Sequence, residues 1–172
     1  MVRYRQAIGA DLPALAQMRW DFRAEDGEEP RETFDAFRER YTRFVDEEMR
    51  CGRLVYWIAE QGDAIVAHMA VIRVPGIPRP TRSADQWGYL TDCYTRPAVR
   101  GTGVGTVLLQ RAQEWAREQD FELLLVAPSD SAERFYRRAG FLDASSFRQF
   151  QLRSFDESEA KDHAVRPTGQ HE

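Results

Sequence analysis

The chain has 172 residues, of which 42% are hydrophobic and 30% charged, and its net charge at neutral pH is −4. These values are typical of one globular domain that is long enough to build a core without disulfides. They argue against general nucleic-acid binding, which needs a basic surface, and no apolar run approaches the roughly 20 residues of a membrane span.

The first half of the chain predicts two helices followed by an antiparallel hairpin. The expected elements are a strand at 2–7, helices at 11–22 and 33–49, and strands at 54–60 and 64–74. The strand assignments follow from alternating or continuous apolar residues, and the helices from apolar residues at i, i+3 and i+4 spacing. A tight turn, Gln61-Gly62-Asp63, joins the two later strands. The charged segment 23–31 separates the helices.

The second half predicts a strand–helix–strand crossover. The expected elements are a strand at 86–95, a helix at 107–119, a strand at 121–127, a helix at 131–139 and a strand at 147–152. The segment 121–127 is almost wholly apolar. This pattern is typical of a strand that is buried on both faces, as in a parallel pair. The order predicts an α/β fold: a mixed, largely antiparallel sheet of six to seven strands with helices on both faces. We expect one domain over 1–153 and a loosely held polar tail over 154–172.

The stretch 100–106, Arg-Gly-Thr-Gly-Val-Gly-Thr, lies between an expected strand and an expected helix. Three glycines within five positions let the backbone turn tightly and approach a ligand closely. The start of a helix adds unpaired N–H groups and the positive end of the helix dipole, so this arrangement suits a phosphate. Arg100 supplies a charged donor at its entrance. The alternative is a plain turn without a ligand.

Two common phosphate-binding loops do not match this stretch. A Walker A loop requires a Lys after its last glycine, and none follows here. In a dinucleotide fingerprint, Gly-x-Gly-x-x-Gly, the third glycine would stand where Thr106 does. The remaining pattern is Arg-x-x-Gly-x-Gly, formed by Arg100, Gly103 and Gly105.

A second motif, Ser-Asp-Ser-Ala-Glu-Arg-Phe-Tyr-Arg-Arg-Ala-Gly-Phe, occupies residues 129–141. Together, the glycine-rich stretch and this helix ending in Tyr-x-x-x-Gly-Phe resemble the acyl-CoA site of the GCN5-related N-acetyltransferases. The resemblance covers roughly residues 3–152 and includes the order of strands and helices. One departure is Ser129, where the family often has Asn.

This resemblance implies an enzyme that transfers the acetyl group of acetyl-CoA to a primary amine by direct attack in a ternary complex. It implies that the glycine stretch binds the pyrophosphate and that the backbone of 93–95 pairs with the pantetheine arm, where the fourth and fifth strands splay apart. Tyr136 would lie near the thioester sulfur as general acid. The implied cofactor contacts are Cys93, Tyr94, Thr95, Arg100, Gly101, Thr102, Gly103, Val104, Gly105, Thr106, Ser129, Ala132 and Phe135.

The amine must lose a proton to attack, and the sequence offers several acceptors for it. Strand alternation is expected to put Leu90, Asp92 and Tyr94 on one face. A charged residue inside an apolar strand needs a partner or a chemical task, so Asp92 is a candidate catalytic base. The alternative for Asp92 is a structural ion pair. His68 is a second candidate base, or an ordinary core histidine, and a chain of water molecules is a third.

The two cysteines, Cys51 and Cys93, lie far apart without metal-ligand spacing. This predicts reduced thiols in a cytoplasmic protein and no metal site. The N-terminus also has no apolar signal segment. Cys93 could also be a nucleophile. The alternative is that it is a small buried hydrophobic residue, as cysteines in strands often are.

The acceptor is not readable from the sequence. Glu25, Asp26, Glu28 and Glu29 lie where this family commonly builds its acceptor pocket, so a small-molecule or peptide amine with positive charge would suit them; otherwise they are a solvated surface. Partners among nucleic acids and membranes are not expected, and a homodimer is left open. Two rival functions remain: a non-catalytic acyl-CoA sensor of the same fold, and a nucleotide-binding module.

Overall fold

The structure is a computed structural model that describes residues 1–81, 85–144 and 147. By its internal contacts the chain divides into two compact units, Met1–Leu125 and Val126–Glu172. None of the helices in the described ranges is long and apolar enough to cross a membrane.

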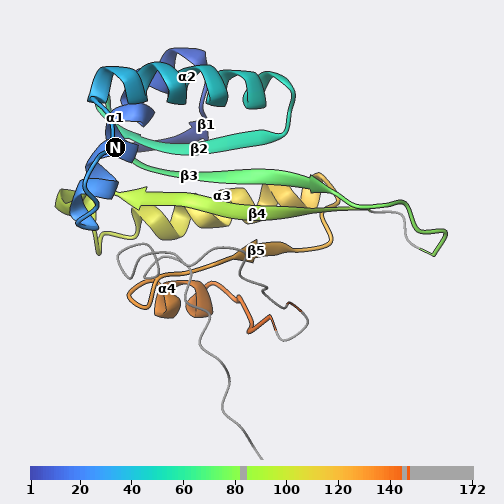
Figure 1. The fold of residues 1–172 in the computed structure, drawn as a ribbon. Helices are drawn as coiled ribbons and strands as arrows, with labels where there is room; N and C mark the ends of the chain where they lie inside the picture. Colours follow the sequence, from blue (N-terminus) through green and yellow to red (C-terminus); the bar gives the residue numbers. More distant parts are fainter. Residues whose placement is uncertain (82–84, 145–146, 148–172) are drawn as a thin grey trace, which may run out of the picture. The chain divides into compact units, whose positions relative to one another are not determined.

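Five strands and four α-helices occur in the described part of the chain (Figure 1). They are β1 (Val2–Gln6), α1 (Leu12–Glu25), α2 (Phe34–Arg50), β2 (Leu54–Gln61), β3 (Ala64–Pro75), β4 (Gln86–Thr95), α3 (Val104–Glu118), β5 (Leu124–Val126) and α4 (Glu133–Arg138). Single 3-10 turns at Gly9–Asp11 and Pro97–Val99 precede α1 and the glycine-rich stretch. The predicted types and order of these elements are confirmed.

The five strands form one sheet in the order β1-β2-β3-β4-β5. The first four are antiparallel neighbours. The N–H of Glu122 donates to the carbonyl of Gln86, and the N–H of Gly88 donates to the carbonyl of Leu123. The pairing therefore advances in the same direction along β4 and along the segment that leads into β5. This parallel approach is what the α3 crossover requires, and the sheet is mixed, as predicted.

The sheet has fewer described strands than the six to seven expected. The expected strand 147–152 lies outside the described residues except for Phe147, which is in no strand. The expected strand 121–127 is shortened to Leu124–Val126, and its first residue, Phe121, is still bonded to the C-terminal turn of α3. Asp120 adopts a left-handed conformation with φ of 57°, and the N–H of Phe121 donates to Ala116 within the helix.

Helices cover both faces of the sheet. Tyr56 and Ile58 of β2 share a buried cluster with Leu15 and Met18 of α1 and with Val45 of α2. Because side chains alternate between the faces of a strand, the intervening residues of β2 face the opposite way. The opposite face is covered by α3, which contacts the first four strands and buries Leu108 and Leu109 completely.

The glycine of β4, Gly88, is closely surrounded by side chains. A Cβ at Gly88 would lie 2.5 Å from Cδ2 of Leu124 and 2.9 Å from Cγ1 of Val71, and also against the ring of Phe121. Side chains from β3 and from the segment after α3 therefore close over the backbone of β4 at this point. Its φ is not in the left-handed region, so conformation places no demand on residue 88.

Candidate functional site

The glycine-rich stretch forms a left-handed turn that leads directly into α3. Gly101 and Gly103 have φ of 77° and 87°, a conformation that favours glycine. Gly103 is the N-cap of α3, which begins at Val104. The sequence predicted a later start, at residue 107. Val104, Gly105 and Thr106 thus form the first helical turn, whose N–H groups have no carbonyl partner within the helix.

The surface of this turn is open. Apart from the glycine itself and its adjacent residues, no heavy atom of the described chain lies within 4 Å of the position where a Cβ would stand on Gly101 or Gly103. A hydrogen bond stabilises the start of the turn, because the hydroxyl of Thr102 donates to the carbonyl of Val99 at 2.7 Å. A braced, open turn at a helix N-terminus fits a phosphate group.

Arg100, at the entrance of the turn, is held by three neighbours. Its Nη2 lies 2.5 Å from Oε2 of Glu25, and its Nε donates to the carbonyl of Thr95 at 2.9 Å. Its guanidinium also lies 5.6 Å from the ring centre of Tyr94. Sequence reasoning identified Arg100 but not Glu25 as its partner, since the two residues are separated by 75 positions and no local pattern connects them.

Glu25 is the last residue of α1 and joins Arg100 to Tyr94. The hydroxyl of Tyr94 donates to Oε1 of Glu25 at 2.6 Å. Partial burial would raise the pKa of Glu25, but the hydrogen bonds from Tyr94 and Arg100 outweigh it and lower this pKa below its ordinary value. Burial, together with the hydrogen bond to Glu25, raises the pKa of Tyr94 to about 12. Glu25 is therefore a carboxylate and Tyr94 a neutral donor at neutral pH.

The middle of β4 contains a bulge. His68 of β3 pairs with Tyr94, but Ala70 pairs with Thr91, so Asp92 and Cys93 together stand opposite a single residue of β3. Asp92 has a left-handed φ of 46°. Such an extra residue reverses the alternation of side chains along the strand.

The predicted common face for Leu90, Asp92 and Tyr94 is therefore wrong. Leu90 pairs with Val71, on the face of α3, whereas Tyr94 pairs with His68 and belongs to the cluster on the face of α1 and α2. Asp92 reaches this second face, where its carboxylate accepts a hydrogen bond from Tyr56. The bulge depends on the pairing with β3, which residue alternation within β4 cannot reveal.

Asp92 is the centre of a buried polar cluster. Nη1 of Arg19 lies 2.8 Å from its Oδ1, and the hydroxyl of Tyr56 donates to its Oδ2 at 2.6 Å. Tyr56 in turn accepts a hydrogen bond from Tyr41 at 2.9 Å. Nε2 of His68 lies 3.4 Å from Oδ1 of Asp92, without the alignment of a hydrogen bond, and the side chain of His68 is completely buried.

These contacts control the ionisation of the cluster. Burial would raise the pKa of Asp92, but the attraction of His68 and Arg19 and the hydrogen bond from Tyr56 outweigh it, so the pKa lies well below its ordinary value. Burial and the nearby Asp92 carboxylate raise the pKa of Tyr56 well above 10. A carboxylate with so low a pKa is a weak proton acceptor at neutral pH. Its contacts thus favour the ion-pair alternative for Asp92, and a role as base stays a prediction.

The acidic segment after α1 is partly neutralised by local arginines. Arg23 lies 2.9 Å from Oε1 of Glu28 and 3.5 Å from Oδ2 of Asp26. Glu25 is engaged with Arg100. The four predicted acidic residues therefore do not act as one uncompensated patch.

In the second unit, the described part of the other motif forms α4 and the turn before it. The carbonyl of Ser129 accepts hydrogen bonds from the N–H groups of Ala132 and Glu133 at 2.9 and 3.1 Å. Tyr136 is 5% exposed, and its ring makes edge contacts with Phe135 and Phe141 at centroid distances of 5.0 and 5.4 Å. The aromatic side chains of this motif thus pack within their own unit.

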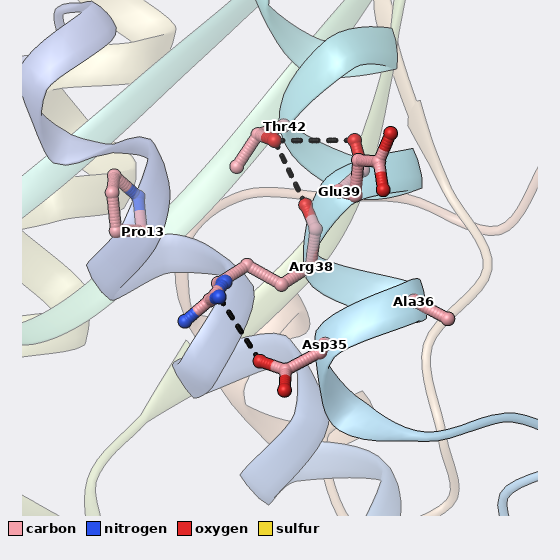
Figure 2. A pocket seen from close by; sticks show the side chains of 6 residues that line it. All are labelled: Pro13, Asp35, Ala36, Arg38, Glu39 and Thr42. Carbon is pink, nitrogen blue, oxygen red and sulfur yellow. Dashed lines mark hydrogen bonds and ion pairs between the residues drawn. The ribbon is translucent and has the colours of Figure 1, made fainter.

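A separate hollow lies between the start of α1 and the first half of α2, where the close-up in Figure 2 shows its lining. Three of its side chains have local partners: Arg38 pairs with Asp35 at 3.0 Å, and the hydroxyl of Thr42 donates to the carbonyls of Arg38 and Glu39. The hollow contains none of the predicted site residues. We therefore centre the candidate site on the glycine turn and not on this hollow.

Sequence comparison relates most of the chain to one protein family. The profile of the Acetyltransferase (GNAT) family matches residues 13–141, a range that includes the glycine turn, Asp92 and Tyr136. No relative among curated proteins matches the sequence.

Solved structures with a similar fold cover most of the chain. A predicted acetyltransferase from Clostridium acetobutylicum, solved with acetyl-CoA, has 28% identity and a TM-score of 0.76, over 88% of this chain and 97% of its own. A GCN5-related N-acetyltransferase from Ralstonia eutropha has 20% identity and a TM-score of 0.72, over 88% of this chain and 99% of its own. Glucosamine-6-phosphate N-acetyltransferase from Arabidopsis thaliana, at 15% identity and a TM-score of 0.65, covers 90% and 98%.

Proposed function

The chain belongs to the acetyltransferase (GNAT) family, and from this membership we propose that it transfers the acetyl group of acetyl-CoA to a primary amine. The observation that carries the proposal is the open left-handed turn at Gly101 and Gly103, which leads into the N-terminus of α3. The related structure from Clostridium acetobutylicum, solved with acetyl-CoA, supports the choice of donor.

In this proposal the first turn of α3 and the glycine turn bind the pyrophosphate of acetyl-CoA. Their N–H groups and the positive end of the helix dipole favour the negative charge. The absence of side chains at Gly101 and Gly103 allows the phosphates to approach the backbone. The backbone of 93–95, just past the bulge of β4, pairs with the pantetheine arm, and Ser129, Ala132 and Phe135 contribute further contacts.

The reaction is a direct displacement. The amine nitrogen attacks the thioester carbonyl, a C–N bond forms, the C–S bond breaks, and the amine loses a proton while the CoA sulfur gains one. The hydroxyl of Tyr136 donates a hydrogen bond to the sulfur as charge develops there. Alignment of the two reactants supplies much of the remaining acceleration.

Asp92 is assigned a positioning role in this reaction. Its carboxylate fixes Arg19 and Tyr56 around the bulge of β4, and its low pKa makes it a poor acceptor for the amine proton. The bulge directly precedes the backbone segment proposed to align the pantetheine arm. This assignment leaves His68 or a chain of water molecules as the acceptor for the amine proton.

The acceptor is proposed to be a small-molecule or peptide amine that carries a further positive charge. Asp26, Glu28 and Glu29 follow α1 directly and are candidate contacts for that charge. Because Arg23 already pairs with two of these residues, the expected preference for a cation is modest.

A screen for CoA thiol release tests the proposal. The purified protein is incubated with acetyl-CoA and with aminoglycosides, polyamines, amino acids and peptides in turn, and free thiol is measured. Release that depends on one amine class supports the transferase. Tight CoA binding without release on any amine would instead indicate an acyl-CoA sensor, and binding of ATP or NAD but not of CoA would indicate a nucleotide-binding module.

A further inference from the structure

The positive charge that should attract a phosphate to the glycine turn is already compensated inside the protein. Arg100 is bonded through Nη2 to Glu25 and through Nε to the carbonyl of Thr95. These two nitrogens make one side of the planar guanidinium fork. A phosphate that binds this side with two hydrogen bonds has to displace the partners that are already there.

Glu25 is also held independently of Arg100. The hydroxyl of Tyr94 donates to Oε1 of Glu25, whereas Arg100 contacts Oε2. Loss of Arg100 would therefore leave the carboxylate in place with one donor. The side chains of Glu25 and Arg100 are 35% and 51% exposed, so water can solvate both charges when they separate.

We propose that Glu25 is an internal competitor for Arg100, which it holds while the glycine turn is empty and releases when the diphosphate of acetyl-CoA binds. The inference rests on the proposed function, because it needs an anionic ligand at this turn. It deepens that function by making Glu25 a residue that sets the affinity of the site without being one of its expected contacts.

The size of the effect follows from the exposure of the pair. Ion pairs between exposed side chains contribute little, and their loss changes an equilibrium by about twofold to fivefold. A Glu25→Gln substitution removes the charge that competes for Arg100 but keeps an oxygen that can accept from Tyr94. It should therefore tighten the binding of CoA by about twofold to fivefold.

The experiment is a calorimetric titration with CoA, without an acceptor amine, of the wild-type protein and of Glu25→Gln, Arg100→Gln and the double variant. Arg100→Gln should weaken binding. In that background, Glu25→Gln should change the affinity less than it does in the wild type, because the competition no longer exists. The matched control is Glu48→Gln. Glu48 lies on α2, outside the glycine turn, and its carboxylate pairs with Arg53 at 2.6 Å. The affinity of this variant for CoA should equal that of the wild type.

Several results would overturn the inference. Glu25→Gln could leave CoA affinity unchanged or weaken it in a protein that keeps its thermal unfolding temperature. It could also tighten binding equally in the presence and absence of Arg100, which would indicate a general effect of charge. In these cases the wild type still binds CoA and the proposed function stands. A wild-type protein that does not bind CoA at all would overturn the proposed function and this inference together.

Discussion

Nη1 of Arg19 lies 2.8 Å from Oδ1 of Asp92, so an ion pair joins the first helix to the bulge of β4. The side chain of Asp92 is 8% exposed and that of Arg19 is 26% exposed. The other carboxylate oxygen of Asp92, Oδ2, accepts a hydrogen bond from the hydroxyl of Tyr56. The carboxylate of Asp92 is therefore paired, and the same contacts hold the bulge of β4 in place.

We expect Asp92→Asn to lower the free energy of unfolding by about 1–3 kcal/mol, because Arg19 loses its buried partner while Asn still accepts a hydrogen bond. Asp92→Ala should cost about 1–2 kcal/mol more, because Asn tolerates the left-handed φ of residue 92 better than Ala does. Urea unfolding of both variants measures the difference. Equal stabilities for the two variants would show that the backbone of the bulge relaxes.

Asp92 should also make stability depend on pH. Its pKa in the folded protein lies well below the value of about 3.9 that it has in an unfolded chain. The unfolded state therefore binds the proton first, and the stability that Asp92 contributes is present at neutral pH and is lost as the pH falls below about 4. Between pH 6 and pH 3, Asp92→Asn should lose less stability than the wild type. If chemical denaturation shows that the stabilities of the wild type and of Asp92→Asn fall in parallel between these pH values, other carboxylates cause the pH dependence.

Gly103→Asp should abolish the binding of CoA. The side chain would enter the open space beside the turn, and its charge would repel the diphosphate. Because Gly103 has a φ of 87°, the substitution should also cost about 1–2 kcal/mol of stability, short of unfolding the protein. Gly103→Asn, which has the same shape without the charge, should lose less affinity. Calorimetry with CoA at a temperature where both variants are folded provides the comparison, and wild-type affinity in Gly103→Asp would remove the turn from the site.

Tyr136→Phe should lower kcat by about tenfold to a hundredfold, the effect of losing a hydrogen bond to a developing charge. The affinity for CoA should stay nearly unchanged, because Phe preserves the packing against Phe135 and Phe141. The measurement is a steady-state rate with the amine that the thiol-release screen identifies, under conditions where chemistry limits turnover. Wild-type kcat across the pH range would reduce Tyr136 to a packing residue.

Replacement of Asp26, Glu28 and Glu29 by their amides should raise the KM of a cationic acceptor by a few fold and leave that of acetyl-CoA unchanged. Glu25 is left intact in this variant because it contacts Arg100. An uncharged amine acceptor serves as the control, since its KM should not respond. Unchanged KM values for both amines would identify the segment as solvated surface.

Local patterns predicted the elements of this fold well, and contacts between distant residues limited the rest. The period of the apolar residues predicted α2, and the glycine spacing predicted the turn before α3. The bulge at Asp92 was missed because it is a property of the register between β4 and β3. The pair between Glu25 and Arg100 was missed because only the folded chain brings the end of α1 to the glycine turn. The acidic segment looked uniform in the sequence, but its residues have different partners.

The crowding around Gly88 limits how this sequence can diverge. A methyl group at this position would overlap Leu124 and Val71, so a lone substitution requires these side chains to shift, whatever its chemistry. A homologue with alanine or a larger residue here should carry smaller side chains at the positions of Leu124 and Val71. These three positions are expected to covary across an alignment, and residue 88 should change only along lineages in which its neighbours have already shrunk.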